Sequence, residues 1–334
     1  MARPIPVIIG PTAVGKTDLS LALALDLEAE IIGGDSRQIY RLFDIGTAKP
    51  TSSQRQAVRH HLIDIVDPDV TLNAARFAQL AWGCIRSIEA RDKQPLIVGG
   101  SGLYIRALTD GLFAGPGANP RLRAALEAEA QSQGFQALHD RLAAVDPTAA
   151  RRIHPHDHVR IIRALEIYTL TGQPISQWQW QWHNPSCRRS FILIGLSRER
   201  EGLRRRIAAR TAAMLHMGLE DEVRMLLAKG YPPTLPALQS VGYGEIVACL
   251  AGQWDLAHAG ELIERHTWQL AKRQMTWFRR VTGIHWISLT DTPETTAKQI
   301  IQNLLAQAWE TPPGASPRGQ PQDQGEPCTC PMPM

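Results

Sequence analysis

The apolar residues of the first hundred positions fall into short runs that alternate with longer stretches. Runs of up to four apolar residues suit buried strands, whereas stretches rich in Leu and Ala, or apolar at helical spacing, suit helices. The predicted strands are 6–9, 31–32 and 95–98, and the predicted helices are 19–27 and 71–93. The alternating leucines of 19–27 would also fit a strand, but the propensity of Ala and Leu favours a helix. Strands that alternate with helices predict a parallel sheet with helical crossovers.

The second half of the chain is mainly helical. A break rich in Pro, Gly and Asn at 115–120 precedes two predicted helices, with Asn119 as an N-cap, Pro120 at the first helical position and Gly172 as a stop. These two helices are 121–133 and 156–171. A strand is predicted at 191–196, and the helical segments after it are 199–229, 242–251, 258–281 and 293–309. We therefore predict an α/β fold: a P-loop-type parallel sheet with flanking helices, an inserted helical subdomain and a helical C-terminal part.

Composition narrows the class of protein only modestly. The 334 residues are 44% hydrophobic and 20% charged, which is typical of a globular protein, and a net charge of +4 permits a nucleic-acid partner without requiring one. No stretch reaches the ~18 apolar residues that span a bilayer, so we expect no membrane segment. Five scattered cysteines (84, 187, 249, 328 and 330) predict reduced thiols and a cytoplasmic protein. The tail after Thr311, rich in Pro, Gly, Gln and Ser, predicts disorder.

The loop between the first strand and helix matches the motif G-x-x-x-x-G-K-[ST] in full. Its residues are Gly10, Pro11, Thr12, Ala13, Val14, Gly15, Lys16 and Thr17. In this context the backbone amides bind a diphosphate, Lys16 neutralises it, and Thr17 can hold Mg²⁺. A nucleotide triphosphatase would also hold Mg²⁺ with an Asp at the end of a strand. Strand 95–98 ends in Gly99-Gly100 instead, and Asp64 is a weak substitute, so the diphosphate need not belong to a nucleotide.

Two further polar segments follow predicted strands. Asp35 closes the second strand, and Ser101 lies in the glycine-rich segment after the third. Strand ends face the ligand crevice in such sheets, although alone each segment is more often a turn.

Together with other segments, these motifs resemble the bacterial tRNA dimethylallyltransferases, also called isopentenyl-diphosphate:tRNA transferases. The resemblance keeps the family's order over roughly residues 1–285. The matching segments are 10–17, 35–40, 44–50, 60–64, 99–104, 146–155, 160–166, 241–243 and 272–277. The chain departs from the family at Ser101, usually Thr, at His156, usually Asn, and at Gly244, usually basic. The last change puts one phosphate or base contact in doubt.

The resemblance implies a reaction and its participants. A dimethylallyl group would pass from dimethylallyl diphosphate to the exocyclic amine of the adenine 3′ of the anticodon (position 37) in tRNA, with release of diphosphate. Asp35 would be the general base, Lys16 would stabilise the leaving diphosphate, and Ser101 would hold substrate. The implied cofactor is Mg²⁺ and the implied partner is the tRNA anticodon stem-loop. We expect a cytoplasmic monomer.

The resemblance also implies an RNA-binding set and a division of the chain. The RNA-binding residues would be Asp35, Ser36, Arg37, Gln38, Ser101, Arg123, Val159, Arg160, Ile161, Ile162, Arg163, Lys272, Arg273, Gln274, Thr276, Trp277 and Arg279. We expect a first part of the core at 1–114, an inserted tRNA-contacting subdomain at 115–188, the rest of the core at 189–310 and a disordered tail at 311–334.

Three other features leave alternatives open. Six arginines lie between 197 and 210, and Arg265, Gln269, Lys272, Arg273, Thr276 and Arg280 form a stripe on one predicted helix that suits a phosphate backbone or is plain surface. Trp178, Trp180 and Trp182 fit a strand or hairpin edge better than a base-stacking platform. His154, His156 and His158 are poorly spaced for zinc.

Two rival functions share the phosphate site. A P-loop small-molecule kinase would transfer phosphate from ATP but leaves the basic helical half unexplained. A non-catalytic RNA-binding protein with a P-loop switch has no use for Asp35 beside the phosphate site.

Overall fold

The computed structural model of the chain describes residues 3–112, 115–179, 190–290 and 293–310. In this part of the chain, a six-stranded sheet has the order β3-β2-β4-β1-β5-β6, and every neighbouring pair is parallel. The strands are β1 (Ile5–Ile9), β2 (Ala29–Gly33), β3 (His60–His61), β4 (Gln94–Gly99), β5 (Phe191–Ser197) and β6 (Ile284–Ser288). The predicted α/β class with a parallel sheet is confirmed.

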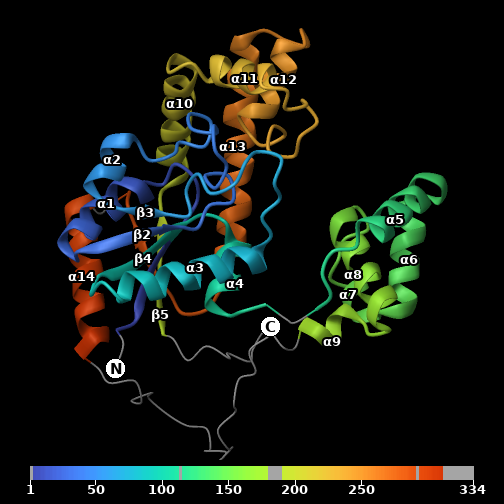
Figure 1. Ribbon diagram of the computed structural model, residues 1–334, viewed down its shortest axis with the longest axis horizontal. Coiled ribbons are helices and arrows are strands. Elements are labelled where there is room, and N and C mark those ends of the chain that lie inside the picture. Colours follow the sequence, from blue (N-terminus) through green and yellow to red (C-terminus); the bar gives the residue numbers. More distant parts are fainter. Residues whose placement is uncertain (1–2, 113–114, 180–189, 291–292, 311–334) are drawn as a thin grey trace, which may run out of the picture.

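Helices cover both faces of the sheet, as Figure 1 shows. These helices are α1 (Lys16–Asp26), α2 (Ser52–Ala57), α3 (Ala74–Glu89), α4 (Gly102–Thr109) and α14 (Glu294–Glu310). Because side chains alternate along a strand, Val7 and Ile9 of β1 pack with α3 and α4, whereas Ile8 packs with α1 and α14. Burial of β1 on both faces explains its continuous apolar run.

A second helical layer stands at one end of the sheet. It consists of α10 (Arg200–His216), α11 (Leu219–Ala228), α12 (Tyr243–Leu250) and α13 (Leu256–Phe278). Its core includes Ile39, Tyr40 and Phe43 from the segment after β2. Since α10 begins directly after β5, this layer covers the carboxyl ends of the strands, where ligands bind in open α/β sheets.

Five helices between β4 and β5 form a hydrophobic core of their own. They are α5 (Pro120–Gln133), α6 (Phe135–Val145), α7 (Pro147–Ala150), α8 (His158–Thr171) and α9 (Ile175–Gln179), and Figure 1 shows them beside the rest of the molecule. The predicted caps are confirmed: the Asn119 side chain accepts a hydrogen bond from the Leu122 amide, and α8 ends at Gly172.

Several elements differ from the prediction. The predicted helix 199–229 is two helices, because Gly218 adopts a left-handed conformation with φ of 92° between α10 and α11. Trp178 lies in α9, so the predicted strand edge is wrong there, whereas Trp180, Trp182 and the tail after Thr311 lie outside the described residues. The sequence did not predict β3, β6, α2, α4, α6 or α7. No described helix is both long and apolar enough to cross a membrane.

Candidate active site

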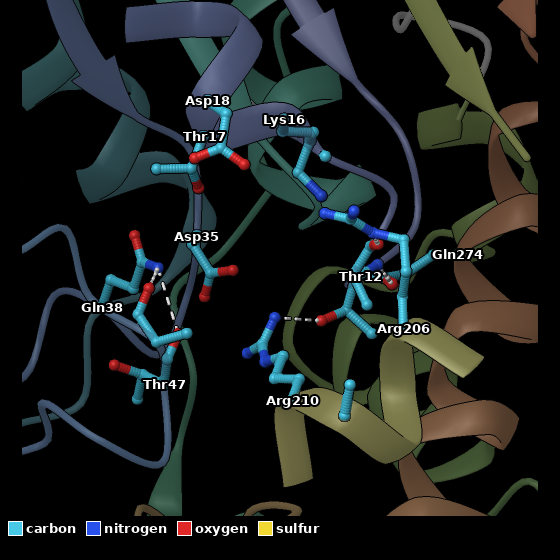
Figure 2. A pocket seen from close by; sticks show the side chains of 14 residues that line it. Thr12, Lys16, Thr17, Asp18, Asp35, Gln38, Thr47, Arg206, Arg210 and Gln274 are labelled. Carbon is cyan, nitrogen blue, oxygen red and sulfur yellow. Dashed lines mark hydrogen bonds between the residues drawn. The ribbon is translucent and has the colours of Figure 1, made fainter. Parts of the chain in front are cut away.

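Three loops meet above the carboxyl ends of β1, β2 and β4, which are neighbours in the sheet. They are the P-loop (Gly10–Gly15), the segment that starts at Asp35 and the turn that carries Ser101. A cavity of about 400 Å³ opens between the P-loop, Asp35 and α10. Figure 2 shows Asp35 and Arg210 directed toward the same space, with Lys16 and Thr17 at its edge. The structure therefore brings the predicted phosphate loop and the predicted base together.

Lys16 lies at the base of this first cavity. Its Nζ donates hydrogen bonds to the carbonyl oxygens of Gly10 (3.0 Å) and Pro11 (2.8 Å). Burial lowers the pKa of Lys16 to about 8, while nearby Asp35 raises this pKa and Arg210 lowers it. The ammonium group is thus a desolvated charge without a bonded carboxylate, which suits an anionic ligand.

Arginines of α10 hold the other side of the P-loop. Arg206 Nε donates to the Ala13 carbonyl at 2.8 Å, and Arg210 Nη1 donates to Thr12 Oγ1 at 3.0 Å. Burial lowers the pKa of Arg210, and Asp35 opposes this shift. The arginine-rich stretch is visible in the sequence, but these contacts with the P-loop were not predicted. The available signal was the spacing of four residues, which puts Arg206 and Arg210 on one helix face.

The segment after β2 is held by hydrogen bonds within itself, to the segment 47–48 and to the distant Ser101. Asp35 Oδ1 accepts from the Arg37 amide (2.8 Å), and Ser101 Oγ accepts from the Ser36 amide (2.9 Å). The Gln38 side chain donates to the carbonyls of Thr47 and Ala48, both at 3.1 Å. Ser101 therefore positions the residue next to Asp35.

The segment 44–49 wraps around one buried carboxylate. Glu222 of α11 accepts hydrogen bonds from the amides of Asp44 (3.1 Å), Ile45 (2.8 Å) and Gly46 (3.3 Å). The hydroxyl of Tyr243 donates to the same carboxylate at 2.5 Å, and burial first, then Glu222, raises the pKa of Tyr243 well above its ordinary value. This network fixes Thr47 at the wall of the first cavity.

The buried Lys49 accounts for Asp64, the weak metal candidate. Lys49 Nζ lies 2.6 Å from Asp44 and 2.6 Å from Asp64, and Arg55 lies 2.7 Å from Asp64. Two cations thus neutralise Asp64, which lines neither cavity described here. Asp64 is a structural ion-pair residue, and its consideration as a metal ligand was wrong.

A second cavity, of about 330 Å³, adjoins the first. The two share wall residues, namely Thr12, Asp35, Thr47, Arg210 and Gln274. Its other walls include apolar side chains of α10 and α13 (Ile207, Met214, Ile263, Leu270) and the segment 239–243, most of which the sequence did not single out. Ser36, Arg37, Ser101 and Arg273 line it too. Asp35 consequently faces both cavities.

The predicted RNA-binding residues on α13 divide by direction. Lys272, Arg273 and Thr276 are exposed, as is Arg279 just after the helix, whereas Gln274 faces the cavities. Trp277 lies against Gly102 of α4, where a Cβ would come within 2.3 Å of its ring. Lys272 and Thr276 are thus exposed and line neither cavity, Arg273 is exposed at the wall of the second cavity, and Gln274 lines both cavities.

The predicted RNA-binding residues of the inserted helices also include both exposed and buried side chains. Val159 and Arg160 are exposed, whereas the side chains of Ile161 and Ile162 are buried in the helical core. The place of Ile161 and Ile162 in the RNA-binding set stays a prediction. Arg123 and Arg163 both bond to the fully buried Glu166, at 2.9 and 2.5 Å. Burial would raise the pKa of Glu166, but these bonds and the Asn119 amide outweigh it and lower the pKa to about 2.

The three histidines near α8 have separate surroundings. His158 stacks on Phe135, and His154 Nδ1 accepts a hydrogen bond from the His156 amide. Among the described residues, no group of three or more His, Cys, Asp or Glu side chains is arranged to hold a metal ion.

Comparison with known proteins gives consistent matches. A family profile described as IPP transferase matches residues 38–281. The tRNA dimethylallyltransferase of Geobacter metallireducens is 50% identical over 281 residues, covering 84% of this chain and 91% of that protein. That of Alkaliphilus oremlandii is 43% identical, covering 91% of this chain and 98% of that protein.

Solved structures agree. The tRNA isopentenylpyrophosphate transferase of Bacillus halodurans has a TM-score of 0.69 at 40% identity, over 92% of this chain and 97% of that one. A eukaryotic dimethylallyltransferase described as acting on tRNA has a TM-score of 0.74 at 27% identity, over 92% of this chain and 80% of that one.

Proposed function

The chain belongs to the IPP transferase family, and on that premise we propose that it is a tRNA dimethylallyltransferase. It transfers a dimethylallyl group from dimethylallyl diphosphate to the exocyclic amine of adenine 37, next to the anticodon, and releases diphosphate. The observation that carries this proposal is the position of Asp35, which lines both the P-loop cavity and a second cavity whose walls include Arg37, Ser101 and Arg273, residues that we predict to bind RNA.

The diphosphate of the donor occupies the P-loop cavity in this proposal. Loop amides, Lys16, Arg206 and Arg210 surround the oxygens that gain charge as the allylic C–O bond breaks and its electron pair moves to the diphosphate. The adenine amine forms the new C–N bond and loses a proton to Asp35, because its delocalised lone pair makes the neutral amine a weak nucleophile.

Mg²⁺ fits the first cavity by donor chemistry. The Thr17 hydroxyl and the Asp18 carboxylate line it, and hard oxygen donors are the ligands that Mg²⁺ prefers. Thr17, with Asp18, would hold the ion, which when bound shields the charge of the diphosphate.

RNA reaches the second cavity from the exposed side. The target adenine must leave its stack, at a cost of a few kcal/mol. We propose that Lys272 and Arg273 of α13 and Arg160 of α8 contact phosphates, and that residues 115–188 form the RNA-contacting subdomain. Gly244 follows Tyr243, where we expect the family usually to have a basic residue, so we propose no phosphate or base contact from position 244.

Incubation with labelled dimethylallyl diphosphate, Mg²⁺ and unmodified tRNA tests the proposal. We expect label in RNA at adenine 37, one diphosphate released per group transferred, and no need for ATP. Strand β4 ends in Gly99 rather than in the Asp of a nucleotide triphosphatase, which favours this outcome. Stoichiometric release of ADP would instead support the kinase alternative, and RNA binding without transfer would support a binding protein.

A further inference from the structure

Gln274 is the residue of α13 that reaches the P-loop. Its Oε1 accepts a hydrogen bond from the Thr12 amide at 2.8 Å, and its Nε2 donates to the Gly100 carbonyl at 3.0 Å. A backbone amide can only donate and a carbonyl can only accept, so these partners fix the orientation of the Gln274 amide group.

The two partners belong to different parts of the site. Thr12 lies in the P-loop, and its hydroxyl is held by Arg210. Gly100 precedes Ser101, whose hydroxyl holds the Ser36 amide beside Asp35. One side-chain amide therefore ties the loop that takes the diphosphate to the segment that carries the base.

Space around this amide is tight. A Cβ on Gly100 would lie 2.6 Å from Gln274 Nε2, closer than real Cβ contacts occur. Glycine at position 100 thus permits the contact, and any side chain there would displace the Gln274 amide.

Gln274 also belongs to the helix that faces RNA. Its neighbours Lys272 and Arg273 are exposed, while Gln274 lines both cavities. Because α13 is one continuous helix of 23 residues, a change in its position at Arg273 moves Gln274 as well.

Building on the proposed function, we propose that Gln274 is a positioning residue that couples RNA binding on α13 to diphosphate binding in the P-loop. RNA docked on Arg273 fixes α13, Gln274 fixes Thr12 and Gly100, and the loop is then held in the conformation that accepts the donor. By reciprocity, diphosphate bound in the loop tightens RNA binding by the same factor. Gln274 acts on the protein backbone, not on RNA.

Calorimetric titration of the full chain with inorganic diphosphate and Mg²⁺, with and without saturating anticodon stem-loop RNA, measures this coupling. We expect RNA to tighten diphosphate binding of the wild type about tenfold, within the usual range of coupling between sites. The ratio of diphosphate affinity with RNA to diphosphate affinity without RNA measures the coupling. In Gln274→Met, which keeps side-chain length but loses both hydrogen bonds, this ratio should fall to near one. RNA affinity measured without diphosphate should stay within about twofold of wild type, because no phosphate contact is lost. The exposed Gln253→Met is the matched control and should keep the wild-type ratio.

Gly100→Ala provides a second variant, because it displaces the same amide from the opposite side. In this variant too, RNA should no longer tighten diphosphate binding. It replaces Gln274→Met if that variant fails to fold. A wild-type ratio in either folded variant, or a ratio near one in the wild-type protein, would overturn the inference. Loss of RNA affinity as large as that of Arg273→Ala would instead make Gln274 an RNA contact. Absence of prenyl transfer by the wild type refutes the proposed function, whereas transfer with unchanged coupling refutes only the role of Gln274.

Discussion

At the scale of single residues, the proposed base Asp35 lies close to two cations. Lys16 and Arg210 face it across the first cavity, and burial lowers the pKa of both cations. Asp35 opposes both shifts, so it favours the charged forms of Lys16 and Arg210.

Replacing Asp35 by Asn tests its role as the base. The amide keeps the shape and can still accept from the Arg37 amide, but it cannot take a proton. We expect turnover to fall about 10²–10⁴-fold, the usual range for general-base catalysis, in single-turnover assays at saturating tRNA. RNA affinity should change much less. Full turnover with weakened RNA binding would instead make Asp35 a positioning residue.

The pKa of Lys16 predicts how donor capture depends on pH. In the free enzyme this pKa is lowered to about 8, and the protonated form binds diphosphate, so kcat/KM for the donor should fall as pH rises through about 8. Bound diphosphate raises the pKa, so kcat should persist to higher pH. Lys16→Arg stays charged throughout and, though slower, should show no such fall. A flat wild-type profile between about pH 7 and pH 10 would contradict this role.

At the scale of secondary-structure elements, features that depend on neighbouring residues could be predicted from the sequence. Features that depend on contacts between distant segments could not. The P-loop and the Asn119 cap depend on neighbours in sequence, and both form as predicted. Strand β6 was missed because His285 and Trp286 are exposed on an edge strand, which exists through its pairing with β5.

Helix α4 was missed for a related reason. Gly99 to Gly102 predicts a turn, yet Gly100 makes room for Gln274 and Gly102 makes room for Trp277. Both partners belong to α13, which is far away in the sequence. The sequence placed Lys16, Asp35 and Ser101 near the site, but it could not reveal how Arg210 and Gln274 enter from distant helices.

Glu166 of α8 tests what holds the inserted helices together. Glu166→Gln removes the charge that Arg123 and Arg163 share. Because the side chains of Arg123 and Arg163 are 40% and 28% exposed, the loss of stability should lie below the about 3–5 kcal/mol of a fully buried pair. Hydrogen exchange in α5 and α8 should therefore become faster. Glu129→Gln, in an exposed pair with Arg141, is the control and should cost under about 1 kcal/mol.

The same pair predicts acid behaviour. The folded pKa of Glu166, about 2, lies below the ordinary value of 4.5, so its stabilisation is present above pH 4.5 and is lost as pH falls toward 2. Glu166→Gln should not show this loss of stability as the pH falls. Identical acid unfolding of the inserted helices in both proteins would show that Glu166 contributes nothing.

At the scale of the whole molecule, the proposed RNA surface combines two parts of the chain. Arg160 lies among the inserted helices, and Arg273 lies on α13 beside the second cavity. Two separated cationic contacts fix the register of a stem-loop better than one, because phosphate contacts position an RNA without reading its sequence.

Arg160→Ala and Arg273→Ala should each weaken tRNA binding at low salt. Each should also reduce the slope of log affinity against log salt by about 1, because a complex with one phosphate contact fewer releases about one counterion fewer when it forms. Binding titrations over a range of salt concentrations measure this slope, with the exposed Arg86→Ala of α3 as control. An unchanged slope would place that arginine away from the RNA.

The position of β1 between β4 and β5 has a consequence for synthesis on the ribosome. Ile5 pairs with Phe191, so one edge of β1 stays open until the whole inserted segment has been translated. The inserted helices contact mainly one another and can fold while the sheet is incomplete. Proteolysis of stalled nascent chains that end before β5 should find these helices protected and the P-loop cleavable, and early protection of the P-loop would contradict this order. On this order, the proposed RNA-contacting helices would form before the phosphate site.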